Sequence, residues 1–406
     1  MNTTQISAQE TAANGLASRG MLAVLVAQFL SAMADNLLFV AAIALLKTAA
    51  HGEALLPLLQ VVFVVAFIVL APYVGPVADA FPKGRVMLYA NLIKLLGALM
   101  ILFGANSLLG YAIAGIGAAI YSPAKYGILT QLVHPDRLVK ANGLLEGSTI
   151  AAILLGVLAG GWLTDQSVVL AVAVSAGMYL LAALANLGIP RLPVIHRFVR
   201  HELAHLLKQF IHNLVVLWGI RDVRFAIIGT SLFWGMGASL RLLIFAWVPV
   251  ALSLLDNQAP ANLMGLVSIG IVVGAGLAAV SVRLEQANRA ILGSLALGPL
   301  IVLLAPMHAF APAAVILMLV GVAGGYFVVP LNALLQERGH ETIGAGRTLA
   351  VQNFFENLAM LGMAGLYFLA IEAGMNPVTV AYGFGIVVTL GMAALAVWRL
   401  RGGRSC

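Results

Sequence analysis

The chain has 406 residues, of which 62% are hydrophobic and only 9% are charged. Soluble domains carry about 25% charged residues, so this composition excludes an ordinary soluble protein. The net charge of +7 would suit nucleic-acid binding, but the basic residues lie between long apolar runs, which favours membrane topology and no nucleic-acid partner. The single cysteine, Cys406, is terminal and excludes a disulfide within the chain.

Twelve apolar runs follow a polar amino-terminal stretch, and each is close to or longer than the roughly 20 residues that cross a bilayer as a helix. The first run is too long for the core of a cleaved signal peptide, so we expect it to remain as a membrane anchor. One long polar stretch, 190–222, separates six runs from six. The runs are 21–46, 55–80, 86–105, 109–131, 139–163, 168–189, 225–252, 261–281, 290–307, 311–334, 346–371 and 377–398.

Lysine and arginine are distributed unevenly between the two sides of these runs. With the amino terminus inside, eighteen of the 22 fall on the inner side, Lys47 alone falls outside, and three lie within spans. Such a bias orients the basic side toward the cytoplasm, so we expect both termini there. The predicted parts are a tail at 1–20, a six-helix bundle at 21–189, a linker at 190–222, a second six-helix bundle at 223–398 and a tail at 399–406.

The two halves carry related polar features at a nearly constant spacing. Duplicated halves with a site at their interface near the midplane are a recurring plan among transporters. The sequence therefore predicts an all-α membrane protein with twelve transmembrane helices in two pseudo-symmetric bundles. The matched positions are Pro123 with Pro330, Glu146 with Glu356, and Asp35 with Arg241, at offsets of 207, 210 and 206 residues.

Six charged residues lie well inside the predicted spans, away from the span ends. A charge at the centre of a spanning helix costs about 2.5–3.5 kcal/mol on insertion scales, so these residues must face a polar interior, form pairs, or both. One interpretation is structural ion pairs within the bundle, and Lys94 in particular could extend toward the inner surface. The other is a substrate cavity with both signs of charge. The six are Asp35, Lys94, Lys125, Glu146, Arg241 and Glu356.

The mixture of signs suits a zwitterionic or anionic ligand. Lys125 and Arg241 could hold a phosphate through charge-assisted hydrogen bonds. Asp35 and Glu356 could take an ammonium group or a coupling cation. Lys125 follows Pro123 by two residues, and a proline removes one helix hydrogen bond at that point.

A loop motif lies between the second and third spans. Gly75, Asp79, Gly84 and Arg85 fit the frame GxxxDxxxxGR on the basic side of the protein. This frame resembles the loop motif of the major facilitator superfamily, which implies a gating role rather than substrate binding. We expect Asp79 to cap a neighbouring helix amino terminus and Arg85 to pair with Asp79.

The linker contains the string HELAH at 201–205, which has the H-E-x-x-H form of zinc proteases. His212 is a candidate third ligand. Basic residues surround the string, and intramembrane proteases bury it inside a span instead. We therefore favour an amphipathic helix on the inner surface over a zinc site, and we expect no catalytic residues and no metal.

Several strings resemble the bacterial lysophospholipid transporter family of the same superfamily, over nearly all of the chain from Met21 to Trp398. YSPAKYGIL and VPLNALLQERG are the most specific of them, and the linker at 190–215 departs from the family pattern. The strings are VAQFLSA (26–32) before DN (35–36), FPKGR (81–85), YSPAKYGIL (121–129), LVKANGL (138–144), GTSLFWG (229–235), VPLNALLQERG (329–339) and AVQN (350–353) before EN (356–357).

The resemblance implies a fold, a substrate and partners. The expected activity is inward movement of lysophosphatidylethanolamine and lysophosphatidylglycerol across the bacterial inner membrane, with handover to a cytoplasmic-face acyltransferase and acyl-carrier-protein synthetase. Sodium stimulation without a resident cofactor is also implied, and we expect a monomer among membrane lipids. The resemblance implies Asp35, Lys125, Arg241 and Glu356 as substrate-site residues, and we predict Tyr121 and Asn332 beside them. The predicted gating residues are Gly75, Asp79, Gly84, Arg85 and Glu146.

Two other functions are compatible with parts of the sequence. A drug exporter of the same fold would favour cations and acidic cavities, whereas Lys125 and Arg241 favour a phosphate. A membrane zinc protease would depend entirely on the HELAH string. The driving ion, the head-group preference and the oligomeric state are open from sequence.

Overall fold

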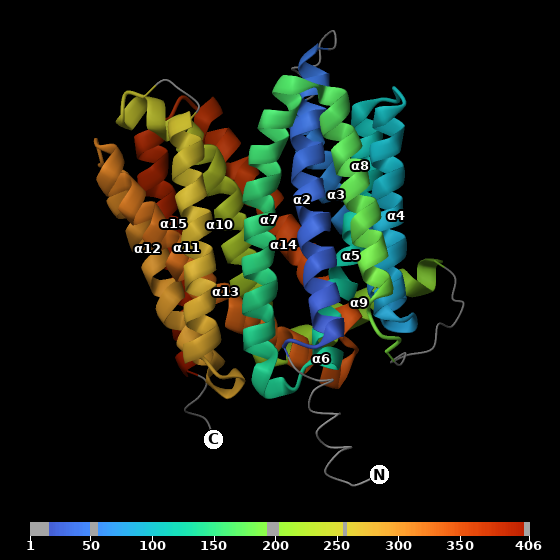
Figure 1. Cartoon of the computed structure of the whole chain (residues 1–406). Helices are drawn as coiled ribbons and strands as arrows, with labels where there is room; N and C mark the ends of the chain where they lie inside the picture. Colours follow the sequence, from blue (N-terminus) through green and yellow to red (C-terminus); the bar gives the residue numbers. More distant parts are fainter. Residues whose placement is uncertain (1–15, 49–55, 193–202, 255–257, 402–406) are drawn as a thin grey trace. The chain divides into compact units, whose positions relative to one another are not determined.

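The computed structural model describes residues 16–48, 56–192, 203–254 and 258–401, and the described residues are almost entirely helical (Figure 1). The first six long helices match the first six apolar runs. They are α2 (Arg19–Thr48), α3 (Leu56–Ala80), α4 (Lys83–Leu102), α5 (Ser107–Gly127), α7 (Leu138–Gln166) and α8 (Val168–Leu187), with the short α6 (Leu129–Leu132) and a 3-10 turn η2 (Pro135–Arg137) between α5 and α7.

The last six apolar runs are helical as well, and the linker contributes a helix of its own, α9 (Leu203–Gly219). α13 ends eight residues beyond the predicted boundary: the string QERGHET is too polar for a span, but its Gln, Glu and Arg residues favour continuation of the helix. The helices are α10 (Arg221–Ala251), α11 (Gln258–Ser281), the 3-10 segment η3 (Leu284–Ala290) leading into α12 (Ile291–Leu304), α13 (Phe310–Thr342), α14 (Ala345–Glu372) and α15 (Pro377–Arg401).

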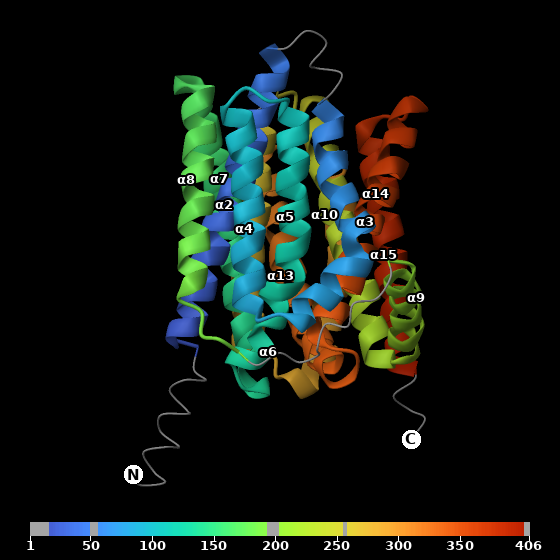
Figure 2. The ribbon, with the colours of Figure 1, turned by 90° about the vertical axis from the view of Figure 1, so that its right-hand side faces the viewer.

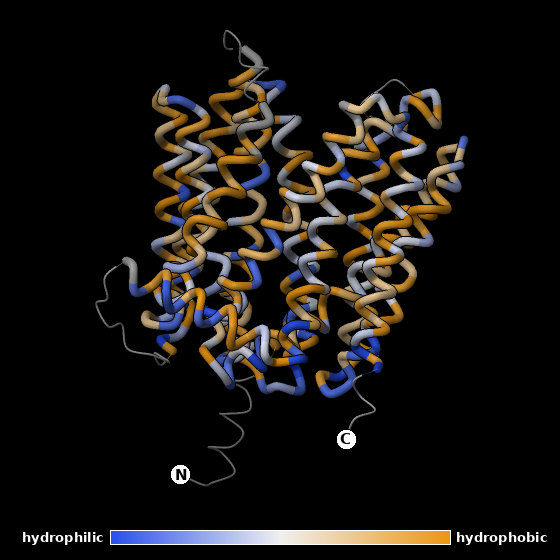
Figure 3. Tube along the Cα trace, turned by 180° about the vertical axis from the view of Figure 1, so that it is seen from behind, coloured by the Kyte–Doolittle hydropathy of each residue, from blue (hydrophilic) through white to orange (hydrophobic). Residues whose placement is uncertain are grey.

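Eleven helices among the described residues are long and apolar enough to cross a membrane. α14 is the twelfth long helix, and its polar side chains between Gln352 and Asn357 lower its hydropathy. In Figure 3 hydrophobic residues run along most of each helix, while hydrophilic ones gather at helix ends and in loops. The predicted class, an all-α membrane protein with twelve spans, is confirmed.

The chain forms two compact units that exchange short segments. Unit 1 contains the first-half helices, α9, and residues 336–354 from the end of α13 and the start of α14. Unit 2 contains the second-half helices and residues 142–150 from the start of α7.

The core of unit 1 is built by α2, α4, α5 and α8, which pack side by side (Figure 2). Leu37, Leu38 and Tyr179 are fully buried there. α4 and α5 approach closely because both carry glycine at the contact: a Cβ at Gly97 would overlap the carbonyl oxygen of Gly110. Small residues allow such backbone contact between membrane helices, where apolar burial gives little driving force.

In unit 2, α15 packs against α10 and α12. α11 and α13 are joined by a second glycine contact, in which a Cβ at Gly274 would overlap the carbonyl oxygen of Val322 and one at Gly321 that of Val267. Asp222 at the start of α10 forms an ion pair of 2.6 Å with Arg399 near the end of α15. Each unit thus has its own helix packing.

Candidate functional site

Asp35 on α2 lies at the centre of a polar cluster inside unit 1. One carboxylate oxygen is 2.7 Å from Lys94 Nζ on α4, and the other accepts a hydrogen bond of 2.8 Å from the Tyr179 hydroxyl on α8. The Lys94 side chain is 2% exposed and that of Asp35 is 19% exposed. A pair this deeply placed is retained only if both charges are compensated, and here each has a partner of opposite sign.

Two uncharged residues complete this cluster. Ser31 lies one helical turn before Asp35, so both side chains share a face of α2. Its hydroxyl accepts from Lys94 Nζ at 3.0 Å and donates to Asn91 at 2.7 Å. We call these five residues, Ser31, Asp35, Asn91, Lys94 and Tyr179, the Asp35 cluster.

Tyr121 and Lys125 on α5 border the Asp35 cluster. Lys94 Nζ lies 5.1 Å from the ring centre of Tyr121 and 5.8 Å from the ring centre of Tyr179. The ammonium is therefore flanked by two aromatic rings. Lys125 follows Tyr121 by one helical turn, about 6 Å along the same face. It is buried, and its Nζ lies 4.1 Å from the ring centre of Tyr126.

α5 also contacts the segment that unit 1 receives from the second half. Asn353 on α14 donates a hydrogen bond of 2.9 Å to the hydroxyl of Ser122. Ser122 is next to Tyr121 in the chain, so α14 meets α5 within one residue of the predicted substrate site.

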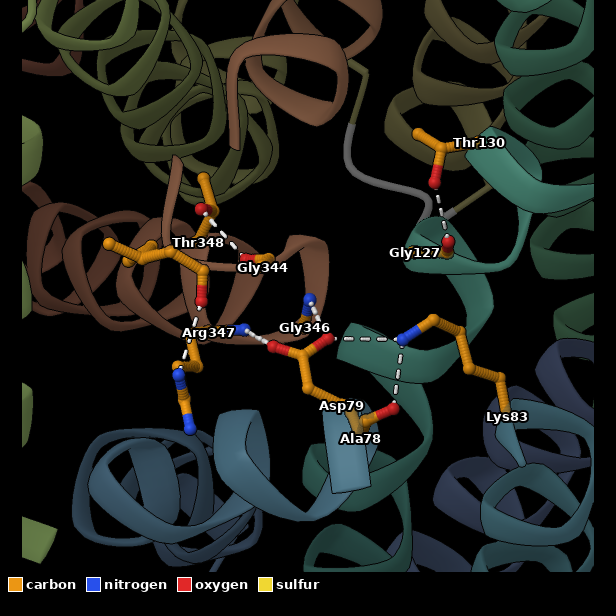
Figure 4. A network of polar contacts seen from close by, with 10 residues as sticks. Ala78, Asp79, Lys83, Gly127, Thr130, Gly344, Gly346, Arg347 and Thr348 are labelled. Atoms are coloured by element: carbon orange, nitrogen blue, oxygen red, sulfur yellow. Dashed lines mark hydrogen bonds and ion pairs between the residues drawn. The ribbon is translucent and has the colours of Figure 1, made fainter. Parts of the chain in front are cut away.

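The loop-motif aspartate, Asp79, caps the amino terminus of α14 (Figure 4). Its carboxylate accepts from the backbone N–H groups of Gly346 at 2.8 Å and Arg347 at 3.0 Å. These N–H groups have no partner inside the helix, and the helix dipole favours a negative charge at this end. We call Asp79, Lys83, Gly346 and Arg347 the Asp79 cluster.

The cation that pairs with Asp79 is Lys83, not Arg85 as the sequence predicts. Lys83 Nζ is 3.1 Å from the carboxylate and also donates to the carbonyl oxygen of Ala78 at 2.8 Å. The chain turns between α3 and α4 at Phe81 and Pro82, so the first residue of α4 points back toward Asp79. Arg85 lies about half a helical turn further on and is exposed.

The two motif glycines serve close packing. A Cβ at Gly75 would lie 2.7 Å from Cα of Arg347, so α3 reaches the backbone of α14 only because this side chain is absent. At Gly84 a Cβ would lie 3.0 Å from the side chain of Ile189, after α8. The motif therefore joins α3, α4 and the start of α14 within unit 1.

The remaining predicted site residues lie in unit 2. Glu146 accepts a hydrogen bond of 3.0 Å from the side-chain amide of Asn332, and both side chains are buried. This joins a predicted gating residue on α7 to a predicted substrate-site residue on α13. Arg241 on α10 is exposed, and Glu356 on α14 is buried.

His201 and Glu202 of the HELAH string lie outside the described residues, while His205 and His212 lie on α9. Within the described part of the chain, no group of three metal-ligating side chains is close enough to hold a metal ion.

Sequence reasoning noted Lys94 but left it out of the site, and it missed Ser31, Asn91 and Tyr179. Neutral polar residues within a span give no charge signal. Ser31 and Asn91 could have been found from their positions one turn away from Asp35 and Lys94 on the same helices.

Long apolar helices that bury an ion pair among aromatic rings, together with a charged loop that caps a distant helix, define a polytopic membrane protein. Residues 24–364 match the sequence profile of the Major Facilitator Superfamily. The chain is also 51% identical over 384 residues to "Lysophospholipid transporter LplT" of Enterobacter sp. (strain 638), covering 95% of this chain and 97% of that protein. The protein of the same name from Shigella boydii serotype 4 gives the same identity and coverage. The chain belongs to this transporter family within the Major Facilitator Superfamily.

Solved structures with the same fold are distant in sequence. The human organic anion transporter MFSD10 has a TM-score of 0.76 at 15% identity, covering 92% of this chain and 99% of its own. A variant of the Escherichia coli fucose:proton symporter FucP has a TM-score of 0.72 at 15% identity, covering 93% of this chain and 98% of its own. At this identity they establish the fold alone.

Proposed function

We propose that this chain transports lysophospholipids across the bacterial inner membrane by alternating access. The observation that carries the proposal is the 51% identity, over nearly the whole length, to proteins named as lysophospholipid transporters. The buried Asp35 cluster supports it, because a head group with a phosphate and an amine requires both signs of charge in one place.

The head group would be bound by the residues predicted from the sequence. In this proposal Asp35 and Glu356 hold the ammonium group, and Lys125 and Arg241 hold the phosphate. Tyr121 and Asn332 contribute polar contacts. In support, Lys125 follows Tyr121 by one turn of α5, and the Tyr121 ring borders Lys94, which pairs with Asp35. A cation and a carboxylate within a few turns suit a zwitterion.

The Asp79 cluster would hold one conformation of the transport cycle. Its carboxylate caps α14 on residues 346 and 347, so separating α3 from α14 would leave these two backbone donors without their acceptor, while Lys83 stays paired with Asp79. Gly75, Gly84, Arg85 and Glu146 belong to the same proposed gate. Such a contact fits a state that must be stable but breakable.

The biological setting is part of the proposal. The distribution of Lys and Arg supports cytoplasmic termini. Delivery to the cytoplasmic leaflet would bring the substrate to a re-acylating acyltransferase and acyl-carrier-protein synthetase. We further propose a monomer without resident cofactor, with sodium as the coupling ion.

The test is uptake by the purified protein in sealed proteoliposomes. Labelled lysophosphatidylethanolamine should cross the bilayer faster than in protein-free liposomes, and imposed sodium gradients should change the rate. Labelled two-chain phosphatidylethanolamine is the control and should not move. Equal movement of both lipids, or none of either, would contradict the proposed function. A rate that is insensitive to sodium would contradict only the coupling.

A further inference from the structure

The linker helix α9 (Leu203–Gly219) has one wide apolar face, of which part is buried and part is exposed. On the buried part Phe210 and Leu217 lie beside the polar Asn213, and the ring of Phe210 packs edge-on against Phe354 of α14 with the ring centres 5.6 Å apart. α9 therefore packs against α14 within unit 1 through this part of its face.

The rest of this apolar face is exposed. Leu207, Ile211, Val215 and Trp218 are 46%, 52%, 68% and 40% exposed. Their spacing of four, four and three residues places them on one side of the helix, over about 16 Å. We call these four residues the apolar stripe. The apolar face extends beyond the part that packs on the protein, so the stripe indicates a surface that something else covers.

The residues beside the stripe are basic or neutral. Lys208 and His212 lie along one edge of it, with His205 beyond them, and all three are exposed. The sequence from 203 to 219 contains no aspartate or glutamate. An apolar face with lysine beside it and tryptophan near its end is the pattern of helices that lie in the interface of anionic membranes.

The position of α9 in the chain supports a lipid partner. α9 ends at Gly219 and α10, a membrane span, begins at Arg221, so only Ile220 separates them. Trp218 is thus held covalently within three residues of a span's end, at the depth where tryptophan is enriched in membrane proteins. A membrane surface is within reach of the stripe whatever other partners are present.

We propose that the apolar stripe of α9 inserts at the boundary between head groups and acyl chains of the adjacent leaflet, with Lys208 and His212 against anionic head groups. α9 then connects this leaflet to α14 through Phe210 and Phe354, and α14 is the helix that Asp79 caps. The inference requires only that the chain spans a membrane and is independent of the transported substrate.

Site-directed spin labels test this on the full-length protein reconstituted in vesicles of phosphatidylcholine and phosphatidylglycerol. Cys406→Ser provides a cysteine-free background. Ile211→Cys and Val215→Cys place labels on the stripe, and His212→Cys, the next residue to Ile211, places the matched control on the polar edge. Stripe labels should collide several-fold more with oxygen than with a water-soluble nickel complex, and the His212 label should show the reverse.

Two results would overturn the proposal. Stripe labels as accessible to nickel as the His212 label would place the stripe in water. Stripe labels protected from both reagents would indicate cover by protein, such as a second copy of this chain.

The charge contribution has its own control pair. Lys208→Gln and Gln209→Glu each lower the net charge by one, but only Lys208 borders the stripe. The oxygen-to-nickel ratio at Ile211→Cys should fall in Lys208→Gln and stay unchanged in Gln209→Glu. The oxygen-to-nickel ratio at Ile211→Cys should also fall when the protein with unchanged Lys208 and Gln209 is placed in vesicles of phosphatidylcholine alone. Equal ratios in both variants and in both lipid mixtures would contradict the anionic contact.

Discussion

At the scale of single residues, the Asp35–Lys94 pair is held by geometry rather than by a large net energy. Two charges removed from water lose hydration that their attraction only partly restores, yet deleting one partner leaves the other uncompensated at a cost of about 3–5 kcal/mol. The hydrogen bonds from Tyr179 and to Ser31 offset part of the lost hydration. We therefore expect replacement of one charged partner to destabilise the protein, and simultaneous replacement of both partners by uncharged residues to be tolerated.

We therefore expect Lys94→Met to lower both the apparent melting temperature and transport, because Asp35 loses its cation. Adding Asp35→Asn should restore the melting temperature, since an uncharged replacement of a buried pair is often neutral. Transport should stay lost, because Asp35 is proposed to bind the substrate ammonium. Thermal unfolding in detergent and proteoliposome uptake measure the two properties. Normal transport by Lys94→Met would show that the pair is dispensable.

Lys125 gives a sharper test of phosphate binding. Lys125→Ala should weaken lysophospholipid binding, and neither Asp35→Asn nor Glu356→Gln should rescue it. Lys125→Arg should keep part of the lysophospholipid binding and transport, because it retains the positive charge. The readout is equilibrium binding of labelled lysophosphatidylethanolamine. Rescue by removing either carboxylate would mean that Lys125 serves as a fixed ion-pair partner instead.

At the scale of helices, glycine decides which elements can touch. α3 reaches α14 at Gly75, and Asp79 one turn later then accepts the first N–H groups of α14. The close approach and the cap are therefore one structural feature, and a side chain at residue 75 should weaken both.

Gly75→Ala should destabilise the contact between α3 and α14, since its methyl group would lie 2.7 Å from Cα of Arg347. Gly177→Ala on α8 is the matched control, because no atom beyond its own stretch of helix backbone lies within 4 Å of a Cβ there. Cross-linking between cysteines on α3 and α14, together with the melting temperature, measures the effect. Equal results for the two variants would exclude a role for close packing at Gly75.

The linker carries a separate prediction. His201→Ala together with His205→Ala should transport normally, and zinc should be absent before and after the change, because basic residues surround the H-E-x-x-H string in the sequence. Zinc content and uptake are the measurements. Stoichiometric zinc in the parent protein, lost with activity on mutation, would restore the metal hypothesis.

At the scale of the whole molecule, the basic residues predict orientation. Cys406 should react with a membrane-impermeant thiol reagent in inverted vesicles and not in intact spheroplasts, because the carboxyl terminus is expected in the cytoplasm. In a Cys406→Ser background, Ala373→Cys, in the exposed turn between α14 and α15, should show the opposite pattern. The same pattern at both positions would contradict the twelve-span topology.

The sequence by itself determined the number and position of the spans, because crossing a bilayer depends on apolar length, which is a local property. It also marked Asp35, Lys94 and Lys125 as residues that need compensation, because hydrocarbon penalises any charge. Ends set by hydropathy alone were less accurate: α13 continues to Thr342 because a helix may leave the membrane without ending.

Only the tertiary structure decided which groups meet. Asp35 finds Lys94 59 residues away and Tyr179 144 residues away, and Asp79 reaches Gly346 across 267 residues. The choice of Lys83 over Arg85 follows from the direction in which the first turn of α4 points. These contacts depend on how helices rotate and pack against one another, and hydropathy, which measures only how apolar each segment is, carries no information about that rotation.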